Sequence, residues 1–388
     1  MKKIILGIFM TGLALMFAMP ATAQITYKPA EDQVLTLYGH VVFGSFYIDQ
    51  DIPGEDNNSD LFFDLYSSSR IGGNYESGDI FGNWELGLSS GSGETSVYLR
   101  QIYARWSING DMSITLGQKL SPYLWPAFTG AAGDNSGVGY GSLYDGFTPR
   151  ITLTYKGFYI DAAAPHTSDL RFDDDTLAGR LGYDYDDDVE FEKKIPRMAV
   201  GYDYTSGTLS IGGGLGYNTF RMKLSEANFD KTVRSWVAFL HGEAAVSSKI
   251  KLRACGWYGV NPIEYGVAGL SGPIDGNDEN ALVVVNPGVN SKVEDTRTYA
   301  GHVEIHVDLG KAVARAGYGY ARSDNDTFAE ADAHQEYWVN AEVPLFKGVH
   351  GTAMSVQPEV HVFDQMKDIN GNDERSALYV GARWNLDF

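Results

Sequence analysis

Cysteine, long apolar runs and basic residues are scarce in this 388-residue sequence, and each scarcity excludes a structural feature or a class of protein. Cys255 is the only cysteine, so no disulfide can form within the chain. Beyond the N-terminus there is no long uncharged apolar run, which excludes a helical membrane protein. Lys and Arg number 30 against 50 Asp and Glu, giving a formal net charge of −20. Such an acidic chain is a poor ligand for nucleic acid, whose phosphates bind Lys and Arg.

The N-terminus has the pattern of an export signal. Lys2 and Lys3 precede an apolar stretch from 4 to 19, and Ala21-Thr22-Ala23 follows as a small-residue cleavage pattern. An N-terminal membrane anchor is the alternative, but the apolar stretch is short for a span and no basic flank follows it. We therefore expect residues 1–23 to be a cleaved signal peptide, and the mature, exported chain to begin at Gln24.

The rest of the chain alternates between apolar and polar residues. In 298–310, Val303, Ile305 and Val307 alternate with Glu304 and His306. The C-terminal stretch 376–388, SALYVGARWNLDF, alternates in the same way. A period of two indicates β-strands with unlike faces, and no long stretch has the period of a helix. The pattern continues from Val34 to Phe388, so we expect one domain over 24–388.

The connections alternate between two lengths. Seven short turns are expected at 76–79, 109–111, 156–157, 205–208, 247–249, 309–311 and 346–348. Eight longer polar loops are expected at 49–60, 89–94, 120–149, 165–194, 219–231, 261–295, 322–333 and 364–375. These fifteen connections join sixteen strands. A soluble sandwich would have short loops at both ends, and a propeller would have a repeat of about 40–50 residues. Neither is present.

The sequence therefore predicts an all-β fold, a 16-stranded antiparallel transmembrane β-barrel with short periplasmic turns and long external loops. A sheet can cross hydrocarbon only if it closes, because every backbone N–H and C=O must be paired there. The last strand, which ends at Phe388, is expected to close the barrel against the first, with Leu35, Leu37, Val41 and Phe43 facing outward.

Several stretches resemble the trimeric general porin family of Gram-negative bacterial outer membranes. They are YLRQIYARWSINGDMSITLGQ (98–118), LTLYGHVVFGSF (35–46), SSSRIGGNYES (67–77) and the terminal Phe388. The resemblance implies a homotrimer in outer-membrane lipid and passive diffusion of small hydrophilic solutes and ions. It also implies that the third loop, 120–149, folds inward and narrows the pore. Two features depart from the family: the loop lacks its usual Pro-Glu-Phe-Gly-Gly, and the second loop, 89–94, is very short for a latch between subunits.

Strand parity selects candidate pore residues. Arg70, Lys119 and Arg150 fall on inward faces, whereas Arg100 is ambiguous by parity and is placed on the pore wall by the resemblance. The candidate pore-constriction residues are Arg70, Arg100, Lys119, Asp134, Asp145 and Arg150. Basic residues on one wall and carboxylates on the facing loop would set a transverse field that sorts ions. Alternatively, the arginines only stay hydrated on a water-filled wall.

The sequence leaves alternatives open for function. A substrate-specific channel for a sugar or an anion would use loop aromatics, which instead could pack the loop against the wall. These aromatics are Tyr123, Trp125, Phe128, Tyr140 and Tyr144. An outer-membrane barrel enzyme is a remote alternative, because no Gly-x-Ser-x-Gly motif or other nucleophile context is found.

No catalytic residue, cofactor or metal is expected. His302, Glu304 and His306 share a face, but the outer two lie roughly 13 Å apart along a strand. The acidic runs 172–176 and 183–192 lack the spacing of a calcium loop. Loose binding of divalent cations by these runs is a hypothesis.

Overall fold

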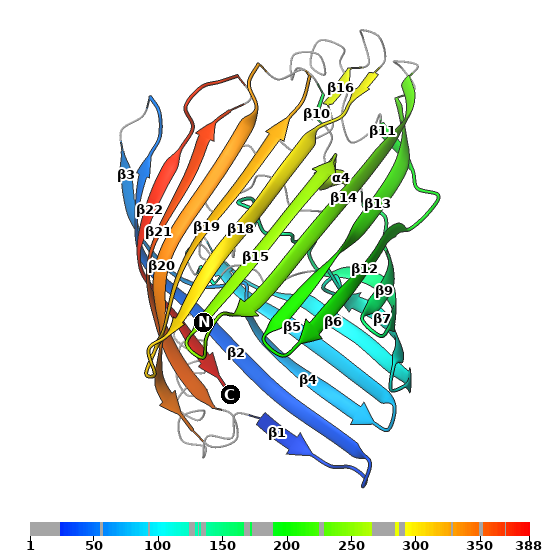
Figure 1. Cartoon of the computed structure of the whole chain (residues 1–388), viewed down its shortest axis with the longest axis vertical. Coiled ribbons are helices and arrows are strands. Elements are labelled where there is room, and N and C mark those ends of the chain that lie inside the picture. The colour runs from blue at the N-terminus through cyan, green and yellow to red at the C-terminus, as the bar shows by residue number, and fades with distance from the viewer. Residues whose placement is uncertain are drawn as a thin grey trace, which may run out of the picture.

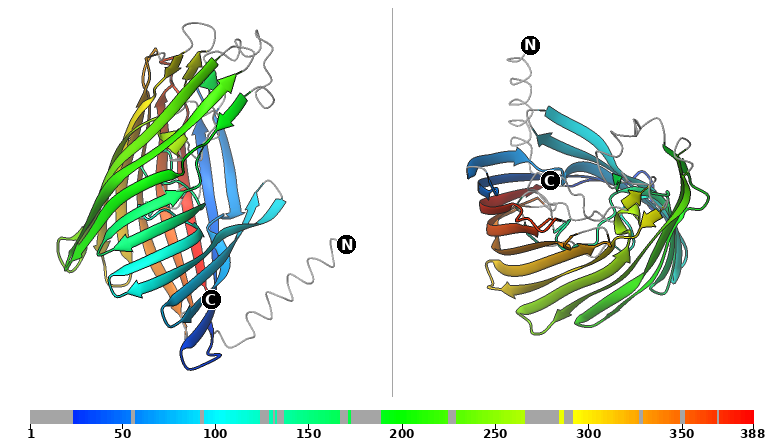
Figure 2. Two further views of the ribbon diagram at one scale, coloured as in Figure 1. Left: turned by 90° about the vertical axis from the view of Figure 1, so that its right-hand side faces the viewer. Right: turned by 90° about the horizontal axis from the view of Figure 1, so that it is seen from above.

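The computed structural model describes residues 24–54, 57–91, 94–123, 129–130, 132, 137–166, 171–172, 189–224, 229–265, 284–286, 292–326, 329–348, 352–368 and 370–388. A single sheet of nineteen strand segments winds around a central lumen (Figures 1 and 2). Its segments are β1 (Gln24–Tyr27), β2 (Gln33–Asp51), β3 (Asn58–Leu65), β4 (Ser69–Ser77), β5 (Ile80–Gly91), β6 (Glu94–Asn109), β7 (Met112–Lys119), β8 (Thr148–Tyr155), β9 (Phe158–Ala163), β11 (Val189–Glu192), β12 (Arg197–Ser206), β13 (Leu209–Leu224), β14 (Phe229–Ala245), β15 (Ile250–Val260), β18 (Arg297–Asp308), β19 (Val313–Asp324), β20 (Asp332–Lys347), β21 (Ala353–Lys367) and β22 (Ser376–Asp387).

These segments make the sixteen antiparallel strands that the sequence predicted. Both β3 and β4 pair with β2, along its two halves, and so form one interrupted strand. In the same way β11 and β12 both pair with β13. The short β1 extends the edge of β2 and is not counted among the sixteen.

The barrel closes where the sequence placed its closure, between β2 and β22. Their register runs from His40 opposite Asp387 to Asp51 opposite Ser376. The terminal Phe388 completes the seam, because its N–H donates to the oxygen of Gly39 at 3.0 Å and its carbonyl accepts from Gly39 N at 2.7 Å. The chain therefore pairs its backbone up to its last residue, as a closed sheet in hydrocarbon requires.

The predicted alternation of faces is confirmed. Leu61 and Phe63 point outward and are 67% and 69% exposed in the single chain, and Val303 is 55% exposed. Inward-facing residues of the same sheet, such as Arg150 on β8 and Glu304 on β18, are buried. An apolar outer face around a polar interior is the pattern of an outer-membrane barrel. Among the described residues, no helix is long and apolar enough to cross a membrane.

The seven predicted turns all fall between paired strands, but several predicted loop boundaries were wrong. The first loop was expected at 49–60, whereas β2 continues to Asp51 and β3 begins at Asn58. The fifth was expected at 219–231, whereas β13 continues to Leu224 and β14 begins at Phe229. At these strand ends the outward residues are polar, as are Arg221 and Lys223 on β13, so the segments were read as loop although Phe220 and Met222 alternate with them and are buried.

Two further features lie at the loop end or beside the wall. The sixth loop contains a short helix, α4 (Pro262–Tyr265), and two strands, β16 (Val284–Asn286) and β17 (Lys292–Glu294). With β10 (Arg171–Phe172) from the fourth loop, these strands form a separate small sheet. The β5–β6 hairpin leans away from the barrel wall (Figure 2). The predicted signal peptide, 1–23, and most of the acidic runs lie outside the described residues.

Candidate pore constriction

The connection between β7 and β8 folds into the lumen, as expected for 120–149. Its residue Gly141 accepts a hydrogen bond at 3.2 Å from the ring nitrogen of Trp257 on β15. Earlier in the same loop, the backbone nitrogen of Ala132 donates to Glu359 on β21 at 2.9 Å. Because β15 and β21 are remote from β7 and β8 around the ring, a segment that reaches both has to cross the interior.

An ion-pair cluster holds the two ends of the loop near β8. Arg150 donates to Asp161 at 2.8 Å and to Asp145 at 3.0 Å, and Arg197 lies 3.0 Å from the same oxygen of Asp145. The hydroxyl of Tyr123 donates to Asp145 at 2.6 Å. Burial, and then the negative charge of Asp145, raise the pKa of Tyr123, so its hydroxyl keeps the proton that it donates. Two cations balance two carboxylates, which buried charges require.

A second set of hydrogen bonds holds the middle of the loop on the far wall. The backbone nitrogen of Thr129 donates to Glu304 at 2.6 Å, and its hydroxyl donates to the same oxygen at 2.8 Å. Gln357 donates to the carbonyl oxygen of Thr129 at 2.6 Å. Together with the bond from Ala132 to Glu359, these contacts fix the loop to β18 and β21. Charge-assisted bonds of this kind are the stronger ones in proteins.

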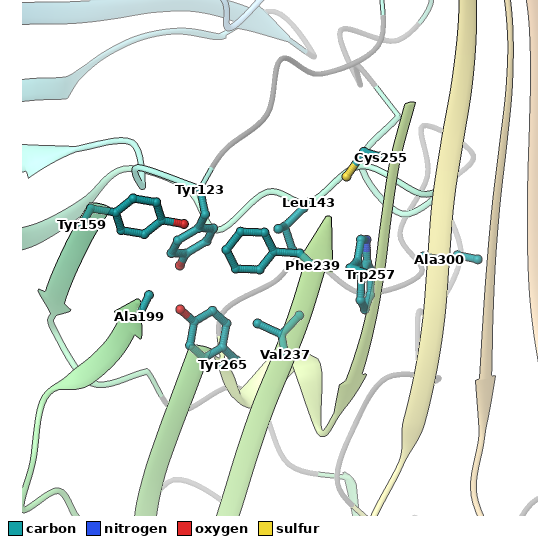
Figure 3. Packing of buried hydrophobic residues seen from close by; sticks show 11 residues of the cluster. Tyr123, Leu143, Tyr159, Ala199, Val237, Phe239, Cys255, Trp257, Tyr265 and Ala300 are labelled. Atoms are coloured by element: carbon teal, nitrogen blue, oxygen red, sulfur yellow. The ribbon is translucent and has the colours of Figure 1, made fainter. Parts of the chain in front are cut away.

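Aromatic packing covers the loop on its wall side (Figure 3). Tyr123 lies between Phe239 and Tyr265, with ring centroids 5.2 and 5.9 Å away. Tyr140 packs on Phe363 at 5.2 Å. Both loop tyrosines are buried, so they pack the loop and do not line an open path. Of the other predicted aromatics, Tyr144 is half-buried, and Trp125 and Phe128 lie outside the described residues.

Gly141 allows the loop backbone to touch the barrel backbone. Its φ is +127°, and a Cβ at this position would lie 2.3 Å from the carbonyl oxygen of Gly301. We expect Gly141→Ala to lower the midpoint of urea unfolding of the purified barrel clearly more than Gly146→Ala. Gly146 also has a positive φ, +71°, but a Cβ there would meet nothing within 4 Å. Equal midpoints for the two variants would refute the close contact.

The wall formed by β4, β5 and β6 carries the most accessible of the predicted arginines. Arg70 Nε and Arg100 Nε lie 3.4 and 3.5 Å from the two oxygens of Glu85. The side chain of Arg70 is 31% exposed and that of Arg100 is 13% exposed. The guanidinium of Arg100 lies 4.5 Å from the ring centroid of Phe147 in the inward loop. Two cations against one carboxylate leave this wall with net positive charge.

A β-bulge explains why Arg100 was ambiguous by parity. Glu85 pairs with Gln101, but the next residue, Leu86, pairs with Leu99, so Arg100 is the extra residue on β6. A bulge changes the side to which the following residues point. Leu99 and Ile102 therefore both face outward, although they are an odd number of positions, three, apart in the sequence. Alternation read across such a point shows apolar and polar residues on both faces, which is why the side of Arg100 could not be assigned from the sequence.

The structure brings the predicted site residues into two groups. Arg70 and Arg100 share Glu85, whereas Asp145 and Arg150 are buried together in the ion-pair cluster. Lys119 lies at the end of β7, with its Nζ 5.6 Å from the ring centroid of Tyr103. Asp134 lies outside the described residues. The buried geometry of Asp145 and Arg150 favours an anchoring role, and their part in the narrowest opening stays a prediction.

Sequence reasoning missed several residues that build the site. They are Glu85, Asp161, Arg197, Glu304 and Glu359. Strand alternation could have placed Glu85 and Asp161 on inward faces. In the structure they lie opposite Gly72 and Thr152 on neighbouring strands. No signal in the sequence paired Glu304 or Glu359 with a loop more than a hundred residues earlier in the chain.

Comparison with known proteins supports the fold. No protein-family model matches the chain, and no curated protein matches it. Among solved structures, the outer membrane channel DcaP of Acinetobacter baumannii has a TM-score of 0.63 at 17% identity, over 92% of this chain and 99% of that one. The anion-selective porin from Comamonas acidovorans has a TM-score of 0.53 at 13% identity, over 91% and 99%. Salmonella typhi OmpF, in complex with daunomycin, has a TM-score of 0.52 at 12% identity, over 93% and 100%.

These similarities extend over nearly the whole length of each chain. Sequence identities this low support a shared fold and nothing beyond it. Together with the closed sheet and the inward loop, they assign this chain the sixteen-stranded β-barrel fold seen in outer-membrane porins.

Proposed function

We propose that this protein is an outer-membrane porin, a passive diffusion channel for small hydrophilic solutes and ions. The observation that carries the proposal is the loop between β7 and β8, which is held to the far wall by Glu304 and Glu359. A loop fixed in this way narrows the lumen. It leaves Arg70 and Arg100 partly exposed on the other wall. Charged side chains around a narrow opening are how pores sort ions.

Conductance of the purified protein tests this proposal. Added to planar lipid bilayers, the refolded mature chain is expected to produce discrete, reproducible conductance steps without an energy source. Liposomes that contain it are expected to swell in small sugars and more slowly in larger ones. Folded protein that inserts but leaves the bilayer electrically silent would refute the channel. The proposal includes no catalytic step and no cofactor.

A substrate-specific anion channel on the same barrel is the second candidate. It is favoured by the net positive wall of Arg70 and Arg100 around Glu85, and by Lys119 nearby at the end of β7. A sugar-specific channel has less support, since Tyr123 and Tyr140 are buried in packing contacts. Concentration-dependent block of the current by small carboxylates, with no block by neutral sugars of similar size, would favour the anion channel.

We expect the double variant Arg70→Gln, Arg100→Gln to shift ion preference toward cations. Removing both guanidinium groups leaves Glu85 without its two cationic partners, so the charge around Glu85 changes from positive to negative. The reversal potential in a salt gradient measures the shift. The control Lys311→Gln removes a charge from an exposed turn outside the lumen and is expected to leave the reversal potential unchanged. Identical reversal potentials for the double variant and the wild type would refute this role.

We further propose that the chain is exported through its predicted signal peptide and assembles as a homotrimer in the outer membrane. The family resemblance of the sequence supports this assembly. Native mass spectrometry of the detergent-solubilised protein is expected to detect three copies of the mature chain. A monomer at all concentrations would refute the trimer without affecting the channel proposal.

A further inference from the structure

Three metal-ligating side chains meet at the external end of the lumen. Asp332 and His334 lie at the start of β20, and Glu374 lies in the connection from β21 to β22. One ligand atom from each lies within 4.8 Å of the others. Asp332 and His334 are 0% and 1% exposed, and the Glu374 side chain is 23% exposed. This cluster plays no part in the proposed ion path along Arg70 and Arg100.

The separations in the cluster suit a small cation better than direct hydrogen bonds. Nε2 of His334 lies 3.4 Å from an oxygen of Asp332 and 3.7 Å from an oxygen of Glu374. Ligands about 2.1 Å from a tetrahedral metal are roughly 3.4 Å from one another. Among the residues that the structure describes, neither ring nitrogen of His334 makes a hydrogen bond. A buried imidazole is thus directed at two carboxylates without satisfying its own polar atoms, which is costly unless something else binds there.

The surrounding structure holds the three ligands in place. The backbone nitrogen of Glu374 donates to the carbonyl of Met366 at 3.3 Å, and the neighbouring Asp373 pairs with Lys367 at 2.6 Å. The ring of His334 lies 5.5 Å from the ring of Tyr140, which belongs to the inward loop. The ligands therefore come from two segments, and the imidazole also packs against the loop that narrows the lumen.

We propose that Asp332, His334 and Glu374 form a binding site for a divalent transition-metal cation of the zinc type. One imidazole nitrogen and two carboxylate oxygens are ligands that Zn²⁺ accepts, and water completes the coordination. Ca²⁺ suits the site poorly because it takes six to eight oxygens. A bound ion joins the last external loop to β20 at the mouth of the barrel. Sequence analysis expected no metal, and the sequence pattern does not bring Glu374 together with Asp332 and His334, which lie about 40 residues earlier in the chain.

Calorimetric titration with Zn²⁺ alone tests the site, with the untagged mature protein in detergent. We expect one high-affinity site per chain. Glu374→Gln and His334→Gln are each expected to weaken Zn²⁺ binding at least about tenfold, since even the loss of a group that only orients a metal ligand costs about tenfold in affinity. Glu374 is partly exposed, so its substitution should leave the barrel folded even if that of His334 does not. Circular dichroism verifies folding of each variant.

The matched control is Glu330→Gln, which removes one carboxylate from the same rim. Glu330 lies beside Gly371 and outside the three-residue cluster. Unchanged Zn²⁺ binding in this variant, with loss in Glu374→Gln, supports the site. Equal loss in both variants, or no saturable binding by the wild type, overturns it, because the rim then attracts cations only through its general negative charge. X-ray absorption at the zinc edge is expected to detect one imidazole ligand, and an oxygen-only shell would also overturn the proposal.

Discussion

Replacing Arg150 by Met is expected to destabilise the barrel by about 3–5 kcal/mol, because removing one partner of a buried ion pair leaves uncompensated charge. Arg150 bonds to both Asp145 and Asp161, and its side chain has no exposed surface. Arg197 still lies beside Asp145 in the variant, but Asp161 loses its guanidinium partner. Methionine has a similar length, so lost packing contributes less than lost charge. Equilibrium urea unfolding of the purified barrel in detergent measures the change.

The matched control is Lys156→Met, on the short turn between β8 and β9. Lys156 pairs with Asp111 at 3.3 Å, but both side chains are 56% exposed. Solvent screening makes such pairs weak, so we expect no measurable change in unfolding. The two variants remove one cation each from neighbouring parts of the same hairpin. Similar unfolding midpoints for both would contradict the view that the buried cluster anchors the loop.

The fold could be predicted from the sequence because a transmembrane barrel constrains every residue. Backbone pairing in hydrocarbon fixes closure, and lipid on one side fixes the period of two. Strand number, closure between β2 and β22, and the inward position of Arg70 and Arg150 followed from these constraints. Loop boundaries did not follow, because the outward residues at the paired strand ends, such as Arg221 and Lys223, are polar, while the alternating Phe220 and Met222 are buried inward.

The site could be predicted only in part, because its contacts depend on the path of one loop. The alternation of residues along a strand predicts that Glu304 and Glu359 face the lumen. It does not predict that Thr129 and Ala132 lie against them. Charge pairing was also predicted only in part. The sequence placed Asp145 opposite the basic residues, and in the structure Asp145 pairs with one of them, Arg150, and also with Arg197, which the sequence did not indicate. The bulge at Arg100 was hidden for a different reason, since a single extra residue interrupts a period of two without any special composition.

Releasing the loop from the far wall is expected to have the largest effect on permeation. Glu304 accepts two hydrogen bonds from Thr129, and Glu359 accepts one from Ala132. Each hydrogen bond to a charged group contributes about 1.5–3 kcal/mol. Because about 1.4 kcal/mol is a tenfold change in an equilibrium constant, losing all three should raise the population of displaced loop by a factor of at least about 100. The double variant Glu304→Ala, Glu359→Ala makes this change.

Neither substitution leaves a buried cation without a carboxylate partner. Arg253 pairs with Glu304, but its Nε also lies 3.4 Å from Glu243. His361 contacts Glu359, but its other ring nitrogen lies 2.9 Å from Glu336. The barrel of the double variant should therefore stay folded while its loop loses three of its hydrogen bonds to the far wall and keeps those from Gln357 and Asn340 to the Thr129 carbonyl. Glu243→Ala is the matched control, because it removes a carboxylate beside Arg253 from the same lumen without touching the loop.

Single-channel recording and liposome swelling distinguish the variants. We expect the double variant to conduct more current per channel and to admit larger oligosaccharides than the wild type, since a displaced loop no longer narrows the lumen. Glu243→Ala is expected to keep the wild-type size limit. If the double variant and this control admit the same range of oligosaccharides, the contacts of Thr129 and Ala132 do not set the width of the opening. The loop would then be held by the cluster of Arg150, Asp145 and Arg197 at its base, and the same recordings on Arg150→Met would reveal that.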